Sequence, residues 1–360
     1  MSKKSRIIVG LSGGVDSSVA AYLLKEEGHE VIGVTMAIWD GQFRVTGKHA
    51  CYGPDEQQEI REAEEIAGLL GIPHLVFDCS AEYKESVLSY FKSEYLEGRT
   101  PNPCIRCNQL IKFGLLPGKA EKEGLRYDYF ATGHYARTGW DKESGRYLLK
   151  KGVDPIKDQT YFLYRLSQDQ LSKVLFPLGG YTKKEIRAIA RDAGIVAEEK
   201  EESQDFYSGD YKDLINEQEN PGNIVDSDGN ILGMHKGIWN YTIGQRKGLG
   251  IAHPEPLYVI GLNKEQNTVV VGTRKETYHS SFTVTDLTWI SVVKPDHSLN
   301  ILCKIRSAQK EKEATLEPMD SGDVKVTFVQ PNDSISPGQS AVFYDGDVVI
   351  GGGIIKLIEN

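Results

Sequence analysis

The sequence predicts an α/β protein in which a parallel sheet is followed by a small middle domain and a C-terminal β-barrel. Residues 7–200 alternate short apolar runs with amphipathic helical stretches, which is typical of βαβ units. Residues 206–275 are rich in glycine and mixed in pattern, and from residue 276 apolar and polar residues alternate as in antiparallel strands. We therefore place the domain boundaries at 1–205, 206–275 and 276–360.

Composition and charge exclude several classes of protein. Hydrophobic residues make up 39% of the chain and charged residues 26%, as in a globular domain, and the absence of an 18-residue apolar run predicts no membrane span. No cleavable apolar segment follows the basic start, so we expect a cytoplasmic protein. The net charge of −9 argues against non-specific DNA binding but permits a local basic groove for one RNA.

The first strand, residues 7–9, runs through a turn rich in glycine and serine into a helix with apolar residues at 19–24. Gly13 and Gly14 allow a tight turn that brings backbone N–H groups against an anion, and the start of the helix adds its positive dipole end. The serines at 12, 17 and 18 supply hydroxyl donors. This pattern predicts a phosphate-binding loop, although the loop lacks the Gly-Lys-Ser/Thr of a Walker A motif.

The alternation continues along the chain. Strands are predicted at 30–36, 74–77, 127–135 and 146–150, and helices at 56–70, 86–95, 108–116, from 157 and at 182–193. Barrel strands are predicted at 282–285, 324–328, 340–344 and 348–350, with Asp345-Gly346 as a hairpin turn. Ligands of parallel sheets bind at the carboxyl ends of the strands, where Met36 lies; its side chain packs either on an adenine ring or in the core.

The five cysteines fall into two groups. Cys79 and Cys303 lie in apolar, strand-like surroundings and are expected to pack as small hydrophobic residues. Cys51, Cys104 and Cys107 lie in polar surroundings. Because an odd number of cysteines in a cytoplasmic chain argues against a disulfide framework, these three are candidates for chemistry.

Six sequence blocks carry a resemblance to a known family. Residues 12–18 resemble the SGGxDS signature of the PP-loop ATP pyrophosphatases, which cleave ATP between its α- and β-phosphates and adenylate a substrate oxygen. Over residues 7–354, the chain resembles the tRNA-specific 2-thiouridylases. The resemblance is carried by residues 12–18 together with the blocks at 100–108, 131–135, 157–161, 241–248 and 336–341. The resemblance implies a tRNA-uridine 2-sulfurtransferase that uses ATP to replace the C2 oxygen of the wobble uridine with sulfur. It also implies a PP-loop domain of the adenine nucleotide alpha hydrolase type, a central domain that contacts tRNA and a C-terminal β-barrel.

The resemblance assigns roles to matching positions. It implies that ATP, with Mg²⁺, is held by Gly10, Leu11, Ser12, Gly13, Gly14, Val15, Asp16, Ser17, Ser18, Met36 and Gly133, with Asp16 near the magnesium-bound pyrophosphate. It implies that tRNA is contacted by Asn102, Pro103, Cys104, His134, Lys157, Asp158, Gln159, Arg306, Ser307 and Gln339. Cys107 matches the cysteine close to the target uridine.

One position departs from the family pattern. A second, persulfide-forming cysteine is expected after a Ser-Gln-Asp/Glu-hydrophobic run, but here residues 203–206 are followed by Tyr207, which cannot carry sulfur. A two-cysteine relay therefore needs another thiol, and the candidates are Cys104 and Cys51.

The three thiols also permit other chemistry. Cys51, Cys104 and Cys107 at one edge of the sheet suit a 4Fe–4S cluster whose fourth iron binds sulfide, an arrangement implied by resemblance to other PP-loop tRNA thiolases. A zinc site, a persulfide relay between Cys104 and Cys107, and simple packing of Cys51 are the alternatives.

Three classes of function are compatible with the phosphate loop alone. RNA thiolation also uses the cysteines and the barrel, whereas a PP-loop amide ligase acting on a small molecule needs neither. A non-catalytic RNA-binding relative needs neither the loop nor the cysteines. We therefore favour RNA thiolation, with tRNA and a sulfur donor (a protein persulfide carrier or free sulfide) as partners; Tyr207 leaves a different target nucleotide as an alternative.

Overall fold

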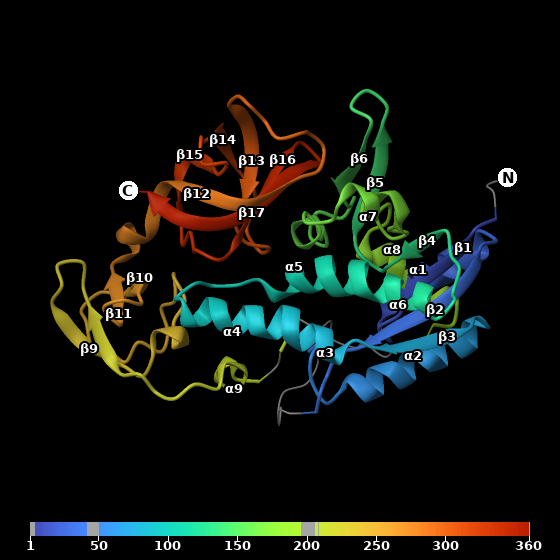
Figure 1. Cartoon of the computed structure of the whole chain (residues 1–360), viewed down its shortest axis with the longest axis horizontal. Helices are drawn as coiled ribbons and strands as arrows, with labels where there is room; N and C mark the ends of the chain where they lie inside the picture. Colours follow the sequence, from blue (N-terminus) through green and yellow to red (C-terminus); the bar gives the residue numbers. More distant parts are fainter. Residues whose placement is uncertain (1–3, 42–49, 196–205, 208, 360) are drawn as a thin grey trace. The chain divides into compact units, whose positions relative to one another are not determined.

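A computed structural model describes residues 4–41, 50–195, 206, 207 and 209–359 of the chain. The chain divides into two compact units. Unit 1 comprises residues 1–87, 104–210 and 347–349, and unit 2 comprises residues 88–103, 211–346 and 350–360. Residues 88–103, which the sequence pattern places inside the first domain, thus belong to the second unit. Figure 1 shows both units coloured along the sequence.

Unit 1 is built on a five-stranded sheet with the order β3-β2-β1-β4-β7, and every pair in it is parallel. Its strands are β1 (Arg6–Gly10), β2 (Glu30–Ala37), β3 (His74–Asp78), β4 (Tyr129–Ala131) and β7 (Val174–Leu175). The chain winds from β1 outward to β3 and then returns to the other side of β1 with β4. The strand order therefore reverses between β1 and β4, the place where open parallel sheets bind ligands.

The helices of unit 1 are partly irregular. They are α1 (Val15–Glu26), α2 (Glu56–Leu70), α3 (Ser80–Tyr83), α5 (Pro103–Cys107), α6 (Leu116–Lys122), α7 (Gln168–Lys173) and α8 (Lys183–Asp192). Two segments have π-helical hydrogen bonding, η1 (Lys84–Leu88) and η2 (Asn108–Leu115), and η3 (Thr160–Phe162) is a 3₁₀ turn. The hairpin β5 (Ala136–Asp141) and β6 (Arg146–Lys151) completes the unit, with Lys150 pairing with Val348.

The helix predicted from residue 157 is only the single turn η3. Asp158 explains the difference, because its Oδ1 accepts hydrogen bonds from the backbone N–H of Gly152 at 3.2 Å and the hydroxyl of Thr160 at 3.0 Å. Side-chain bonds of this kind compete with helical hydrogen bonding and fix a turn instead.

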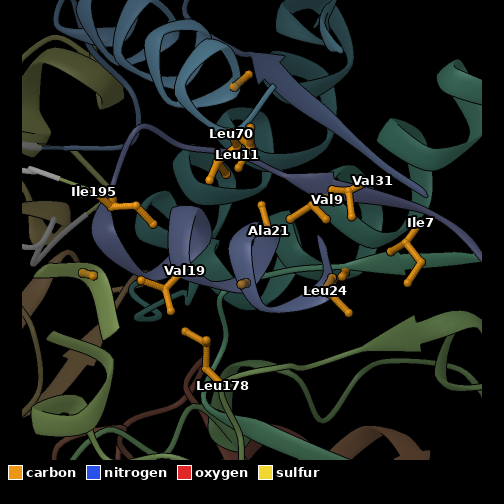
Figure 2. Packing of buried hydrophobic residues seen from close by; sticks show 14 of the residues in the cluster. Ile7, Val9, Leu11, Val19, Ala21, Leu24, Val31, Leu70, Leu178 and Ile195 are labelled. Atoms are coloured by element: carbon orange, nitrogen blue, oxygen red, sulfur yellow. The ribbon is translucent and has the colours of Figure 1, made fainter. Parts of the chain in front are cut away.

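The core of unit 1 gathers around α1. Ile7 and Val9 of β1 and Val31 of β2 pack with Val19, Ala21 and Leu24 of the helix, as Figure 2 shows. Leu70 from α2, together with Leu178 and Ile195, extends the cluster. Because α1 is enclosed on several sides, the position of its first turn is fixed by packing.

Unit 2 contains a four-stranded sheet and a closed barrel. The sheet has the order β10-β11-β8-β9, with strands β8 (Gly222–Val225), β9 (Ile231–His235), β10 (Tyr258–Asn263) and β11 (Thr268–Gly272). The barrel strands are β12 (Tyr278–Trp289), β13 (Leu299–Lys304), β14 (Lys312–Pro318), β15 (Val324–Asp333), β16 (Ser340–Asp345) and β17 (Val348–Glu359). β12 pairs with both β15 and β17, which closes the ring and confirms the predicted barrel.

Short helical elements complete unit 2: α4 (Ser89–Leu96), α9 (Tyr211–Ile215), η4 (Ile238–Asn240) and η5 (Arg274–Thr277). Cys303 packs in the barrel core beside Phe282 and Phe343, as expected for a structural cysteine. In the described part of the chain, no helix has the length and apolar character needed to cross a bilayer.

Candidate nucleotide and sulfur-transfer site

The loop between β1 and α1 has the form of an anion site. Gly14 is the N-cap of α1, and no side chain caps the helix there, so the first-turn N–H groups are not taken up by a capping side chain. Gly13 has a φ of 71°, and a Cβ on it would lie 2.7 Å from the carbonyl oxygen of Glu59. Glycine is therefore required for the loop to lie against α2.

Two serines of the loop bond the loop's own backbone. The Oγ of Ser17 accepts the backbone N–H of Ser12 at 3.2 Å and donates to the carbonyl oxygen of Gly14 at 3.1 Å. Ser18 donates to the same carbonyl at 2.8 Å. These hydroxyls hold the loop in shape.

Gly133 follows β4 and lies directly against the first turn of α1. A Cβ at this position would be 2.7 Å from both the carbonyl carbon of Asp16 and the nitrogen of Ser17. The loops after β1 and β4 thus meet at the point where the strand order reverses, and the structure brings Gly133 to the loop as the sequence motifs imply.

The remaining predicted nucleotide residues line or support the same edge. Leu11 is buried in the core, and its carbonyl oxygen accepts the hydroxyl of Thr35 at 2.8 Å. Gly10 ends β1 against the ring of Phe130, and Val15 packs on the core of unit 1. Met36 is half-buried near the carboxyl end of β2.

Asp16 is held by two residues that the sequence analysis did not single out. The Nζ of Lys183 lies 2.8 Å from each carboxylate oxygen, and the hydroxyl of Tyr135 donates to Oδ1 at 2.8 Å. Tyr135 is buried, and Lys183 is the first residue of α8. The sequence offers one indication of this role. Lys183 is expected at the start of a helix, where the helix dipole disfavours a cation unless an anion lies nearby.

Cys104 and Cys107 lie one turn apart on α5, and both are partly exposed. The thiol of Cys107 is nevertheless enclosed by surrounding protein atoms. This burial raises its pKa to about 12, and the charge of Lys112 opposes the increase. Cys107 is therefore a protonated thiol at neutral pH.

Cys51 is exposed, and the residue after it contacts Phe206 and Tyr207. The backbone N–H of the next residue, Tyr52, donates to the carbonyl oxygen of Phe206 at 2.9 Å, and the rings of Tyr52 and Tyr207 lie 6.3 Å apart. Tyr207 is buried; residues 203–205 and 208 lie outside the described residues.

The buried Tyr83 links the three thiols. Its ring stacks on Tyr52 at 5.5 Å. Its pKa is raised by burial first and then by the charges of Cys107, Cys51 and Cys104, so all three thiols lie within electrostatic range of one side chain. However, among the residues that the structure describes, which include these cysteines, no three His, Cys, Asp or Glu side chains form a group able to hold a metal ion. The arrangement therefore does not fit a 4Fe–4S cluster.

Two predicted tRNA regions of unit 1 are fixed close to Tyr135. His134 shares a hydrogen bond of 2.8 Å with Thr132 and lies between the rings of Phe113 and Phe176. Burial, together with the charge of Lys112, holds the pKa of His134 well below its usual range, so its imidazole is neutral. Gln159 accepts the N–H of Tyr135 at 2.9 Å, which positions the loop of Lys157 and Asp158.

In unit 2, two of the predicted tRNA residues bind the protein's own backbone. Gln339 Nε2 donates to the carbonyl oxygens of Thr100 at 3.1 Å and Pro101 at 3.2 Å, next to Asn102 and Pro103. Arg306 donates to the carbonyl oxygens of Ile243 and Ser334 and to the hydroxyl of Ser336. Ser307 beside it is exposed. Gln339 and Arg306 thus support the surfaces around them.

Comparison with known proteins covers nearly the whole chain. Residues 5–207 match the family model described as "tRNA methyl transferase HUP domain", residues 212–273 the "tRNA methyl transferase PRC-barrel domain" and residues 279–355 the "Aminomethyltransferase beta-barrel domain". The HUP, PRC-barrel and β-barrel descriptions agree with the parallel sheet and the closed barrel observed here.

Three curated relatives share one name, tRNA-specific 2-thiouridylase MnmA. The protein of Endomicrobium trichonymphae is 51% identical over 99% of this chain and 100% of its own length. A protein of Caldanaerobacter subterraneus, numbered MnmA 1, is 48% identical, covering 99% of each chain. That of Acetivibrio thermocellus is 46% identical over 99% of this chain and 100% of its own. With identities this high over full length, the chain belongs to the family of tRNA-specific 2-thiouridylases.

Proposed function

We propose that the protein is an ATP-dependent tRNA-uridine 2-sulfurtransferase, which makes 2-thiouridine at the wobble position of tRNA. The observation that carries the proposal is the presence, in one unit, of a phosphate loop at the point of strand reversal and of thiols on α5. The full-length relatives named as 2-thiouridylases support the same reaction.

In the first step, the C2 oxygen of the uridine attacks the α-phosphorus of ATP, and the uridine loses its N3 proton. The bond from the α-phosphorus to the bridging oxygen breaks, and pyrophosphate leaves with the electron pair. The first-turn N–H groups of α1 and the backbone of Gly133 would hold the phosphates. Mg²⁺ bound with ATP would supply positive charge to the phosphates, and the carboxylate of Asp16 would hold it.

In the second step, sulfur replaces the adenylated oxygen. We propose that Cys51 takes the place of the absent family cysteine, because it is exposed to a donor and lies beside Phe206 and Tyr207. The terminal sulfur of a Cys51 persulfide would attack C2, and AMP would leave with the electrons of the C–O bond.

Cys107 would then release the product. Its sulfur, after losing its proton, attacks the Cys51 sulfur, the S–S bond breaks, and 2-thiouridine leaves while a Cys51–Cys107 disulfide forms. A dithiol reductant must reduce this disulfide before the next cycle. The described cysteines form no metal-holding group, and the proposed transfer uses thiols alone.

The domain limits and the location of the protein form part of the proposal. Domains at 1–205, 206–275 and 276–360 are supported by family-model matches that begin and end near the same residues. A cytoplasmic location is supported by the substrates, because the proposed reaction needs tRNA and ATP together. The proposed sulfur donor is a protein persulfide, whose outer sulfur atom passes to the Cys51 thiolate while the donor cysteine leaves as a thiolate. Free sulfide can load Cys51 only by attacking the Cys51–Cys107 disulfide, which leaves a Cys51 persulfide and a Cys107 thiolate.

Thiolation of an unmodified tRNA transcript tests the proposal. The purified protein, ATP, MgCl₂ and either sulfide or a persulfide-loaded carrier protein are incubated with tRNA, and the nucleosides are measured by mass spectrometry. We expect 2-thiouridine that depends on ATP, with AMP released in equal amount, and none with C107A. A thiolated base other than wobble uridine, or AMP release that needs a small amine and no tRNA, would contradict it.

A further inference from the structure

Lys183 forms a closely held ion pair at the phosphate loop. Its Nζ contacts both oxygens of Asp16 at 2.8 Å, and it lies 5.9 Å from the centre of the Tyr135 ring. The two side chains are only 13% and 26% exposed. Both belong to unit 1, so their contact lies within one compact body.

The position of Lys183 is unfavourable for a cation in the absence of an anion. It is the first residue of α8, at the positive dipole end of the helix. Glu185 of the same turn accepts hydrogen bonds from Thr182 in a capping box, and Asp154 accepts the backbone N–H of Lys183 at 3.0 Å. A mostly buried ammonium also needs a counter-charge to offset desolvation. Asp16 supplies this charge through both of its carboxylate oxygens.

Asp16 is also the carboxylate in the first turn of α1, where the proposed triphosphate binds. A triphosphate brings several negative charges to this turn, and the accompanying Mg²⁺ attracts the carboxylate of Asp16. The ammonium of Lys183 is then attracted more strongly to the phosphates than to Asp16, and the carboxylate of Asp16 is attracted more strongly to Mg²⁺ than to Lys183. Lys183 needs only a rotation of its flexible side chain to leave Asp16 for a phosphate oxygen.

We propose that Lys183 binds the β- and γ-phosphates of the nucleotide and balances the charge of pyrophosphate as it leaves, and that Asp16 holds it in place until the nucleotide arrives. The inference depends on the proposed function only because that function identifies the nucleotide as ATP. It adds Lys183 to the residues that bind phosphate at this site. Lys183 stays protonated throughout and forms no covalent bond. The bond that breaks is the one from the α-phosphorus to the oxygen that pyrophosphate keeps.

Comparing the binding of ATP with that of AMP distinguishes a phosphate-binding role of Lys183 from a purely structural one. Binding of ATP and of AMP, each with MgCl₂, is measured by calorimetry on the full-length protein, K183M, K183R and K184M. Lys184 is the matched control because it is the next residue of α8 and is exposed. K183M is expected to weaken ATP binding about 10- to 100-fold, as for loss of one charge-assisted contact, and AMP binding less than about twofold. K183R should recover most of the affinity, and K184M should leave it unchanged.

Two results would overturn the inference: ATP affinity unchanged in K183M, or ATP and AMP affinities that fall together. Thermal melting of each variant ensures that folded protein is compared, and K183R gives a folded second variant if K183M is unstable. These binding measurements need no tRNA. If the protein failed to thiolate tRNA, the proposed function would be wrong, but the effect of K183M on ATP affinity would still be measured.

Discussion

The backbone N–H of Tyr52 donates a 2.9 Å hydrogen bond to the carbonyl oxygen of Phe206, a residue 154 positions further along the chain. This bond aligns Cys51 with the segment that carries Tyr207. We therefore expect C51A to reduce tRNA thiolation at least about 100-fold, because it removes the nucleophile that carries sulfur. ATP binding should not change. C303A serves as the control, since its thiol is buried in the barrel core and its loss affects stability alone.

Restoring a cysteine at position 207 tests the same idea from the other side. Tyr207 is 2% exposed and packs near Tyr52 and Phe206, so Y207C leaves a cavity that costs about 3 kcal/mol. Despite this cost, the double variant C51A/Y207C should regain thiolation per folded molecule relative to C51A. Equal activity of C51A and the unaltered protein would exclude Cys51 as the sulfur carrier, and loss only in C104A would assign that role to Cys104.

The Cys107 thiol should react slowly with iodoacetamide at neutral pH. Its pKa is raised to about 12, so the reactive thiolate is a small fraction at pH 7 and grows about tenfold per pH unit until the pH approaches that value. Site-specific mass spectrometry at pH 7, 8 and 9 measures this increase. A rate for Cys107 that levels off below pH 9 would show that the thiol is more acidic than the structure indicates.

G133A should weaken nucleotide binding by about 5- to 150-fold. The added methyl group would lie 2.7 Å from two backbone atoms of α1, so either the loop after β4 or the helix must move, at about 1–3 kcal/mol. Gly118 in α6 offers a control, because a Cβ there meets no atom within 4 Å. Calorimetry with ATP and thermal melting check both effects; nucleotide affinity retained in G133A would refute the assigned contact between this loop and α1.

Q339L should weaken tRNA thiolation with little effect on ATP affinity. It removes the donor to Thr100 and Pro101, which costs about 1–3 kcal/mol and loosens the turn that holds Asn102 and Pro103. The exposed Gln330 on β15 gives the matched variant Q330L. We expect KM for tRNA to rise about tenfold in Q339L only, in steady-state assays with varied tRNA. The same rise in both variants would point to a general effect on unit 2.

The alternating pattern was sufficient to predict the parallel sheet, the phosphate loop and the barrel, because each depends on local apolar periodicity. It could not reveal that Ser17 and Ser18 bond the loop's own backbone, since a hydroxyl that shapes a turn and one that binds a ligand look alike in sequence. Lys183 was missed for a related reason. Its partner Asp16 is 167 positions away, and no local pattern encodes such a pairing.

Contacts between residues far apart in sequence also determine the structure of two segments that the sequence pattern did not predict. The pattern predicted an ordinary helix at 108–116, but the structure has the π-helical η2 there, where Gln170 bonds the carbonyl oxygens of Gln109 and Phe113. Residues 88–103 read as a continuation of the first domain, yet the rings of Phe91 and Tyr95 pack on Tyr211 of unit 2. Neither partner is close in sequence.

Pro337 and Gln339 form hydrogen bonds with Thr100 and Pro101, and these bonds have a consequence for truncated forms of the protein. Residues 100–102 directly precede α5, so the peptide that leads into the helix of Cys104 and Cys107 is held by Pro337 and Gln339, near the C-terminal end of the chain. An isolated N-terminal fragment would keep its phosphate loop while the helix of Cys104 and Cys107 lost its anchor. Such a fragment would bind ATP and still fail to modify RNA, a failure that would be mistaken for the loss of an RNA-docking surface alone.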